Sequence, residues 1–228
     1  MESSHNPRLL KEPPRGFTLV EMLVVLAIII IVTSVALLGQ NTFNRSLLLT
    51  DTAYTIALSI REAQSLGLSS RKFAGEQNAG YGVHFEQGLS TYRIFVDTSD
   101  NATGPTGCPR GDLGTPEEKP GNCIYESADG TLESFTLRRG FTISNICVKT
   151  TSLGSQGNLH CAKGGGALSA LDIVFMRPNT DSIIVGTRGS PNTYESAFIE
   201  IKDPTSAAVR CVTVSKTGQV AVPKVCPS

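Results

Sequence analysis

The sequence has no excess of either charge, because 20 lysine and arginine residues balance 20 aspartate and glutamate residues over 228 positions. A neutral chain has no general attraction to nucleic acid or to acidic lipid, so a partner of either kind requires a local basic patch. The length suits one sizeable domain with an appendage rather than two domains of ordinary size.

The sequence also lacks the spacings that catalytic and phosphate-binding sites need. It has no G-x-S-x-G elbow for a nucleophilic serine. The glycine run from Lys163 to Ala167 lacks the spaced glycines and the terminal lysine of a phosphate-binding loop. These absences predict that the protein is not an enzyme and has no catalytic residues and no cofactor.

The residue pattern gives little support to a metal site. The chain has three histidines and no C-x-x-C unit, so Cys147, His160 and Cys161 lack a fourth zinc ligand of normal spacing. The polar stretch Asp97 to Asp100 offers oxygen ligands, but an EF-hand loop would need glycine at Ala102. We therefore predict no metal site, and calcium near Asp97 to Asp100 stays an open question.

Cysteine is absent from the N-terminal part of the chain. Six cysteines follow the longest apolar segment, and an even number in that position favours disulfide bonds in an oxidising compartment. Six cysteines allow 15 connectivities, of which pairing between sequence neighbours is the simplest. This pairing joins Cys108 to Cys123, Cys147 to Cys161 and Cys211 to Cys226.

The longest apolar stretch runs from Phe17 to Leu38, and its 22 residues would span about 33 Å as a helix, close to the hydrocarbon thickness of a bilayer. Three cations precede it within the leader, and only Arg45 follows within twenty residues, so we predict a cytoplasmic N-terminus and an exported remainder. The stretch is too long for a cleaved secretory signal, and no Ala-x-Ala site follows it. Its one charge, Glu21, is costly in lipid and is expected to have a partner. The three leader cations are Arg8, Lys11 and Arg15.

The residues Gly16-Phe17-Thr18-Leu19-Val20-Glu21, with a short basic leader before them and an apolar run after them, resemble the processing motif of type IV pilins and type II secretion pseudopilins. The resemblance implies that prepilin peptidase cuts between Gly16 and Phe17 and methylates the amino group of Phe17. It also implies that Glu21 contacts the positively charged N-terminus of a neighbouring subunit in the filament. An unpaired carboxylate in that apolar setting would be penalised.

Helical periodicity continues beyond the apolar run. Small and apolar residues recur every three or four positions, which predicts one long helix from about Phe17 to about Ser69 whose second half packs on a sheet. Gly39 and the polar residues after it mark a weak point where this helix could bend or melt. The stripe consists of Leu49, Ala53, Ile56, Ile60, Ala63 and Gly67.

The period changes to two after Tyr81, where residues 81–97 predict a β-hairpin that turns at residues 86–88. Short strand candidates separated by Gly, Pro or Asn favour a mostly antiparallel β-sandwich and an α+β fold, with the lollipop architecture of pilins. The expected organisation is a cleaved leader (1–16), a transmembrane and filament-core helix (17–39), an amphipathic helix half (40–70) and a β-rich globular domain (71–228). The further strand candidates are 132–138, 141–148, 171–176, 182–186, 197–202, 208–215 and 219–222.

The globular part more loosely resembles the GspH/FimT-type minor pilins and pseudopilins. The similarity covers residues 61–222 and rests on the helix end, the early hairpin and the last strand pair. One departure is Asn179 after Phe175-Met176-Arg177-Pro178, where that branch commonly has glycine, and asparagine also tolerates a positive φ.

The predicted function is that of a minor pilin or pseudopilin, a structural subunit of a type IV pilus or a type II secretion pseudopilus. Its partners would be other pilins, prepilin peptidase, the inner-membrane assembly machinery and, before assembly, membrane lipid. It would cross the inner membrane once and then enter a filament. One alternative is a DNA-binding minor pilin of a competence pilus, with Arg210, Lys216 and Lys224 as phosphate contacts. Another is a solitary anchored surface domain, which has no need of the processing motif.

Overall fold

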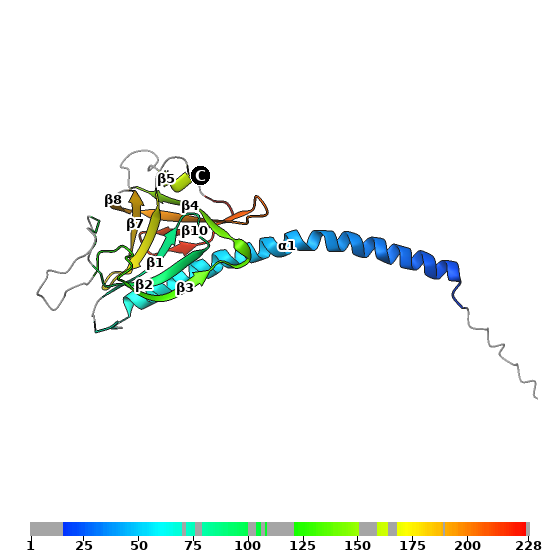
Figure 1. Cartoon of the computed structure of the whole chain (residues 1–228), viewed down its shortest axis with the longest axis horizontal. Helices are drawn as coiled ribbons and strands as arrows, with labels where there is room; N and C mark the ends of the chain where they lie inside the picture. The colour runs from blue at the N-terminus through cyan, green and yellow to red at the C-terminus, as the bar shows by residue number, and fades with distance from the viewer. Residues whose placement is uncertain are drawn as a thin grey trace, which may run out of the picture. The chain divides into compact units, whose positions relative to one another are not determined.

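The computed structural model describes residues 16–69, 72–75, 79–99, 104–105, 108, 121–150, 159–163, 168–188 and 190–226 (Figure 1). The chain divides into two units, residues 1–44 and residues 45–228. The leader cations, Asp100 and Ala102 lie outside the described residues. The fold is α+β, with an N-terminal helix that begins in an apolar segment and a C-terminal domain of antiparallel sheets.

A single α-helix, α1 (Leu19–Leu68), covers almost the whole predicted range. It begins at Thr18, whose hydroxyl accepts the backbone N–H of Glu21 at 3.2 Å, as expected for an N-cap. It ends where the Ser69 hydroxyl donates to the carbonyl oxygen of Leu66 at 2.7 Å. The backbone stays helical through the weak point at Gly39 and the polar residues that follow it.

The strands that the structure describes in the second unit form two antiparallel sheets. The six-stranded sheet has the order β3-β2-β1-β6-β7-β8, and the five-stranded sheet has the order β11-β10-β9-β4-β5. The strands are β1 (Gly80–Glu86), β2 (Thr91–Asp97), β3 (Gly130–Thr136), β4 (Thr142–Lys149), β5 (Leu159–Cys161), β6 (Ala170–Phe175), β7 (Ser182–Arg188), β8 (Ser190–Tyr194), β9 (Ser196–Lys202), β10 (Val209–Ser215) and β11 (Val220–Ala221).

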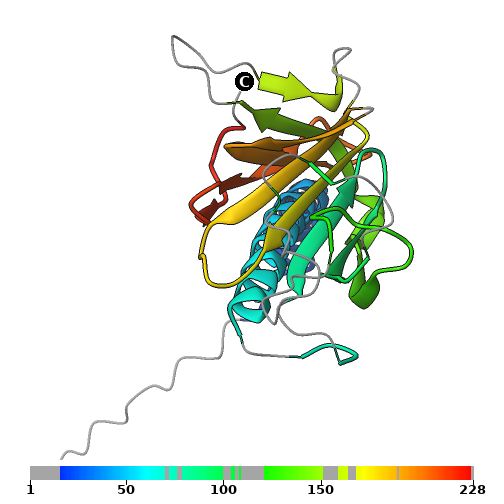
Figure 2. The same ribbon diagram turned by 90° about the vertical axis from the view of Figure 1, so that its left-hand side faces the viewer.

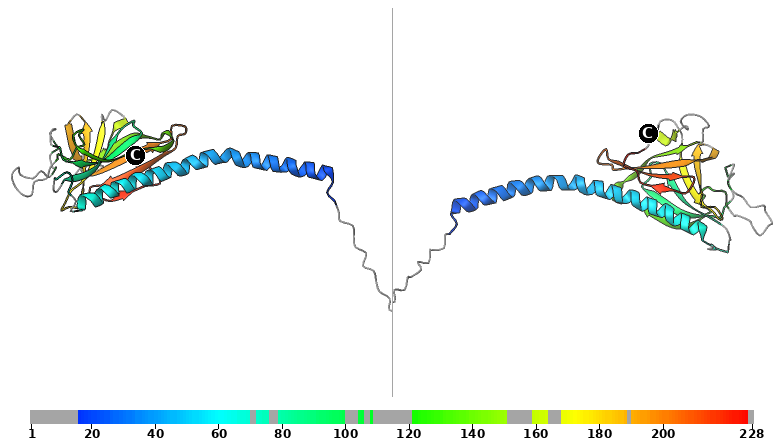
Figure 3. Two further views of the ribbon diagram at one scale, coloured as in Figure 1. Left: turned by 60° about the horizontal axis from the view of Figure 1, so that its bottom comes forward. Right: turned by 180° about the vertical axis from the view of Figure 1, so that it is seen from behind.

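The core of the second unit lies between the two sheets and the second half of α1. Buried side chains of both sheets and of the helix form one contiguous apolar cluster. Figures 2 and 3 show the cyan segment of α1 lying along the sheets. The sheets are also joined directly, because Gly88 N–H donates to Ile143 O at 2.8 Å and Ile143 N–H donates to Leu89 O at 2.9 Å.

The small-residue stripe of α1 is buried as its periodicity indicates. All six stripe residues, from Leu49 to Gly67, are buried. At Gly67 a side chain has no room, since a Cβ there would lie 2.4 Å from the carbonyl oxygen of Phe175 at the end of β6. The last turn of the helix therefore lies close to the sheet because its residue is glycine.

All nine predicted strands are present, and two more strands lie among the described residues that the sequence did not predict. The hairpin of β1 and β2 pairs Phe85 with Tyr92 and turns through Gly88, whose φ is 86°. The unpredicted strands are β5, which has only three residues, and β8, whose sequence Ser-Pro-Asn-Thr-Tyr has little strand character. Both lie at sheet edges, where short and proline-containing strands are tolerated.

Candidate processing and assembly site

The predicted cleavage point lies just before the start of the helix. Gly16 has no regular structure, and a Cβ added to it would meet no atom of the chain within 4 Å. The side chain of Phe17 is 75% exposed. The packing of the chain itself thus does not require glycine at position 16, and the bond between Gly16 and Phe17 lies in an exposed segment of backbone.

The first turn of α1 contains a threonine N-cap and a carboxylate, which belong to Thr18 and Glu21. Thr18 and Glu21 have the spacing of a capping box, in which a threonine at the N-cap precedes a glutamate at the third helical position. The hydrogen bond from Glu21 N–H to Thr18 Oγ1 forms half of this box. A carboxylate there also interacts favourably with the helix dipole. Sequence reasoning assigned Glu21 to assembly and gave Thr18 no role, although the T-x-x-E spacing signals an N-cap.

The helix that follows is exposed and apolar on every side. The span Leu19–Leu37 has a mean hydropathy of 2.8, and none of it is buried. Its two hydroxyl residues bond within the helix, Thr33 Oγ1 to Ile29 O at 2.7 Å and Ser34 Oγ to Ile30 O at 2.7 Å. Hydroxyl groups whose hydrogen bonds are made within the helix are compatible with an environment that contains no water. The span is long and apolar enough to cross a membrane.

Comparison with known families matches residues 14–37 to the prokaryotic N-terminal methylation motif. The matched segment contains Gly16, Phe17 and Glu21, so it supports a type IV pilin-like protein that prepilin peptidase processes. The same motif implies assembly into pilus filaments, and with the apolar helix it is consistent with membrane anchoring. Comparison with curated proteins and with solved structures found no match. The GspH/FimT branch is therefore not confirmed.

The six cysteines form three disulfides between sequence neighbours. The bonds are Cys108–Cys123, Cys147–Cys161 and Cys211–Cys226. Cys147 and Cys161 are direct partners in the β4–β5 ladder, so this bond holds the short edge strand to its sheet. Disulfide bonds in the second unit agree with export of this part of the chain.

The disulfide bonds also determine whether the cysteines are available as metal ligands. Among the described residues, Glu200, Cys211 and Cys226 come close enough to share an ion, but both cysteines are bonded to each other. A disulfide sulfur is not the thiolate that a metal requires.

Asp97, from the open calcium stretch, is bonded within the chain. Its carboxylate accepts the backbone N–H groups of Asn122 at 3.0 Å and Cys123 at 2.7 Å. Its role in the structure is thus to hold a neighbouring segment of backbone, and Asp100 lies outside the described residues.

The three residues predicted to contact DNA do not form one patch. Arg210 Nε donates to Thr50 Oγ1 at 3.1 Å, and Lys216 forms an ion pair with Glu195 at 3.0 Å. Arg210 and Lys224 line a hollow of about 350 Å³ beside Tyr54, and Lys216 is not part of its lining. Two of the three predicted cations are therefore brought together.

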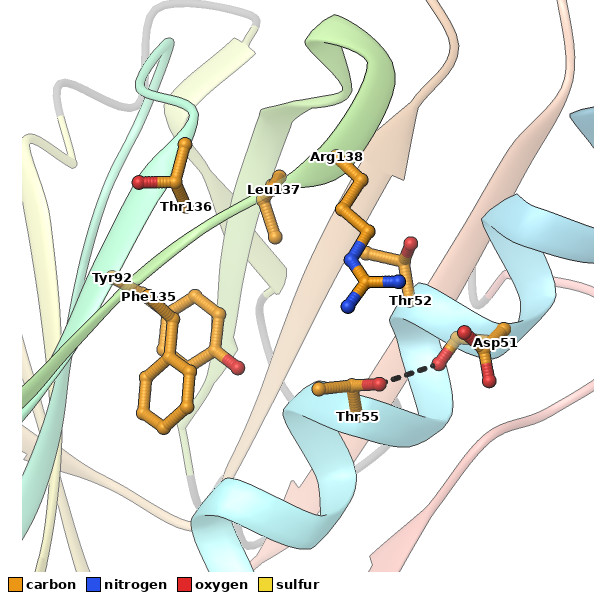
Figure 4. Close-up of a pocket in the computed structure, with 8 residues that line it drawn as sticks. All are labelled: Asp51, Thr52, Thr55, Tyr92, Phe135, Thr136, Leu137 and Arg138. Atoms are coloured by element: carbon orange, nitrogen blue, oxygen red, sulfur yellow. Dashed lines mark hydrogen bonds between the residues drawn. The ribbon is translucent and has the colours of Figure 1, made fainter.

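A second hollow, of about 320 Å³, lies between α1 and strands β2 and β3 (Figure 4). Thr52 and Thr55 lie on the helix side, where the Thr55 hydroxyl donates to the carbonyl oxygen of Asp51 at 3.0 Å. Phe135 stacks on Tyr92 on the sheet side, with ring centroids 4.9 Å apart. The lining offers neither a paired acid and base nor a nucleophile next to a base, so it has no arrangement typical of catalysis.

Proposed function

We propose that the protein is a minor pilin or pseudopilin with a structural and non-catalytic role. It is made as an inner-membrane precursor with its N-terminus in the cytoplasm and its disulfide-bonded domain exported. Prepilin peptidase cuts after Gly16 and methylates Phe17, and the protein then enters a type IV pilus or a type II secretion pseudopilus through its apolar helix.

The observation that carries this proposal is the exposure of the apolar helix together with its processing motif. A helix that is apolar all round needs lipid or other helices around it. A permanent anchor would satisfy this need with lipid alone, but it would require neither the exposed Gly16–Phe17 bond nor Glu21. A filament core supplies helices in place of lipid, and it supplies a cationic N-terminus for the Glu21 carboxylate.

Processing is tested by the intact mass of the protein purified from cells with active prepilin peptidase. The expected mass is that of residues 17–228 with three disulfides and one added methyl group. Cells that lack the peptidase are the control and should yield the full chain. A full-length product in both strains would overturn the pilin assignment.

The assembly role of Glu21 is tested with Glu21→Ala, which should insert into the membrane normally and be lost from sheared filaments. Because this change also removes an acidic side chain from the first turn of the helix, Thr18→Ala is the matched control, since it removes the N-cap hydrogen bond and keeps the carboxylate. We expect Thr18→Ala to assemble far better than Glu21→Ala. If both variants were lost from filaments to the same extent, Glu21 would act only by stabilising the start of the helix.

DNA binding is the second candidate, and the hollow beside Tyr54 favours it. A ring and two cations in one place suit a single strand that stacks a base and places phosphates on Arg210 and Lys224. The double variant Arg210→Glu/Lys224→Glu should abolish salt-dependent retention of single-stranded DNA by the full chain in detergent micelles. Lys216→Glu is the matched control and should retain DNA normally. Retention that is equal in all three proteins would leave only the filament role.

A further inference from the structure

The outer face of the six-stranded sheet has a buried polar cluster that none of the preceding functions uses. His84 on β1 and Asp172 on β6 are direct partners in the ladder, and their side chains are 7% and 0% exposed. The Nδ1 atom of His84 lies 2.7 Å from Asp172 Oδ1, and its Nε2 atom lies 3.1 Å from Glu86 Oε1. One imidazole therefore lies between two carboxylates.

This geometry suits a protonated His84 between two ionised carboxylates. A neutral imidazole has one N–H donor and one acceptor nitrogen, so it could bond one carboxylate and would direct a lone pair at the other. The imidazolium ion donates to both. Burial alone lowers the pKa of His84, but the hydrogen bonds and charges of Asp172 and Glu86 outweigh burial and raise it.

The segment 121–129 covers this cluster. The ring of Tyr125 lies 4.6 Å from the ring of His84. On β2, the Arg93 guanidinium carbon lies 4.8 Å from the Tyr125 ring centroid, and Arg93 Nη1 donates to the Tyr125 hydroxyl at 2.7 Å. Tyr125 thus contacts both His84 and Arg93, and a positive charge on either attracts its ring.

A second titratable group attaches the same segment one strand away. Asp97, fully buried on β2, accepts the backbone N–H groups of Asn122 and Cys123. Burial raises the pKa of Asp97 to about 8, although these two N–H groups oppose the shift. Asp129 fixes the other end of the segment, because it accepts the N–H groups of Thr98, Ser99 and Glu126.

We propose that His84 and the carboxylates around it form a pH-sensitive latch, which holds segment 121–129 on the sheet at neutral and acidic pH and releases it at alkaline pH. The groups that face His84 are Glu86 on its own strand, Asp172 on β6, Tyr125 of the segment, and the cation Arg93, its direct partner on β2. Loss of the imidazolium proton leaves the Asp172 carboxylate buried beside a neutral ring, and the cost of that charge falls when the segment lifts and water enters.

The direction of this pH dependence follows from the linkage between proton binding and stability. A group whose pKa is raised by folding stabilises the folded arrangement fully below its ordinary pKa, and this stabilisation is lost as the pH rises through the raised value. The pKa values of His84 and Asp97 are both raised, so each group stabilises the attached segment less as the pH rises. The contribution of Asp97 fades between its ordinary pKa and about 8, and that of His84 is lost as the pH passes its raised pKa. The Cys108–Cys123 disulfide, which does not titrate, links the segment to Cys108 at every pH.

The test is hydrogen–deuterium exchange of the oxidised full chain in detergent micelles, read by mass spectrometry at several pH values and corrected for the intrinsic pH dependence of exchange. Protection of residues 121–129 should fall by about tenfold for each unit by which the pKa of His84 is raised. Residues 196–202 of β9 should keep their protection. His84→Gln should show the low protection already at neutral pH, whereas His160→Gln, on β5 of the other sheet, should behave as the wild type.

A second measurement keeps the proposal testable if His84→Gln folds poorly. Carbon-13 labelling of histidine side chains in the wild type should show His84 as an imidazolium at neutral pH and report its titration directly. A neutral His84 ring at pH 6 would overturn the latch. So would protection of residues 121–129 that stays constant while His84 titrates.

Discussion

The contact between α1 and β6 at Gly67 allows a strict test of the packing. Replacing Gly67 with alanine puts a methyl group 2.4 Å from the carbonyl oxygen of Phe175, 2.8 Å from its carbonyl carbon and 2.9 Å from its Cβ. These are atoms of the strand itself or rigidly attached to it, so a change of rotamer cannot relieve the overlap. The helix or β6 has to move.

Two effects of this substitution oppose each other. Alanine in place of glycine inside a helix is worth about 1 kcal/mol, whereas overpacking of a close-packed core costs about 1–3 kcal/mol. Because the overlap is with backbone, we expect the cost to lie at the upper end and the net loss to be about 1–2 kcal/mol. For a chain of this size that corresponds to a fall of about 2–8 °C in the melting temperature.

Thermal unfolding of the full chain in micelles, followed by circular dichroism, measures the effect. Ser65→Ala is the matched control, since Ser65 is exposed on the same turn and alanine should leave stability equal or slightly higher. A Gly67→Ala protein that is as stable as the wild type would refute the close approach of helix and strand.

Three further predictions concern the second unit. In the wild type the free energy of unfolding should fall between about pH 4 and pH 8, because burial raises the pKa of Asp97 and its stabilisation fades as the pH rises, and Asp97→Asn should make this fall smaller. Urea titrations at several pH values measure the dependence of the free energy of unfolding on pH, and a dependence that Asp97→Asn leaves unchanged would contradict the prediction. Replacing Cys211 and Cys226 with serine removes a bond across 15 positions and should cost about 3 kcal/mol in the same assay, so a cost near zero would contradict the loop-closure estimate. Ile60→Ala should cost about 2–5 kcal/mol because Ile60 is fully buried, whereas Leu58→Ala, on the exposed face of α1, should cost little, and similar costs would contradict the orientation of the helix.

The elements that could be predicted from the sequence are those whose buried residues repeat at a regular spacing along the chain. The stripe of α1 and the hairpin of β1 and β2 follow from spacings of three or four and of two, because an amphipathic helix or strand has to bury one face. The cysteine pairing followed from proximity in the chain. The strand β5 could not be predicted in this way, since its three residues are held by β4 and by the Cys147–Cys161 bond rather than by their own pattern.

The burial of His84 illustrates what local patterns omit. Its place on β1 puts it on the face opposite Val83 and Phe85, which would ordinarily be solvent-exposed. Its ring packs against Tyr125, in a segment about forty residues later, and its partner Asp172 comes from a strand 88 positions away. The alternation of residues along a strand indicates on which face of the sheet a side chain lies, but it does not indicate what covers that face.

The N-cap at Thr18 has a consequence for the processed chain. Cleavage after Gly16 would create an amino group on Phe17, one residue before the cap, where a positive charge opposes the helix dipole. N-methylation would keep that charge, so each released subunit would begin with an electrostatically unfavourable end. Glu21 is the acidic residue of the first turn and lies only four positions from this amine. Within a single subunit the carboxylate would therefore limit fraying of the helix start, and a chain that lost it would enter assembly with a less ordered N-terminus as well as without its contact.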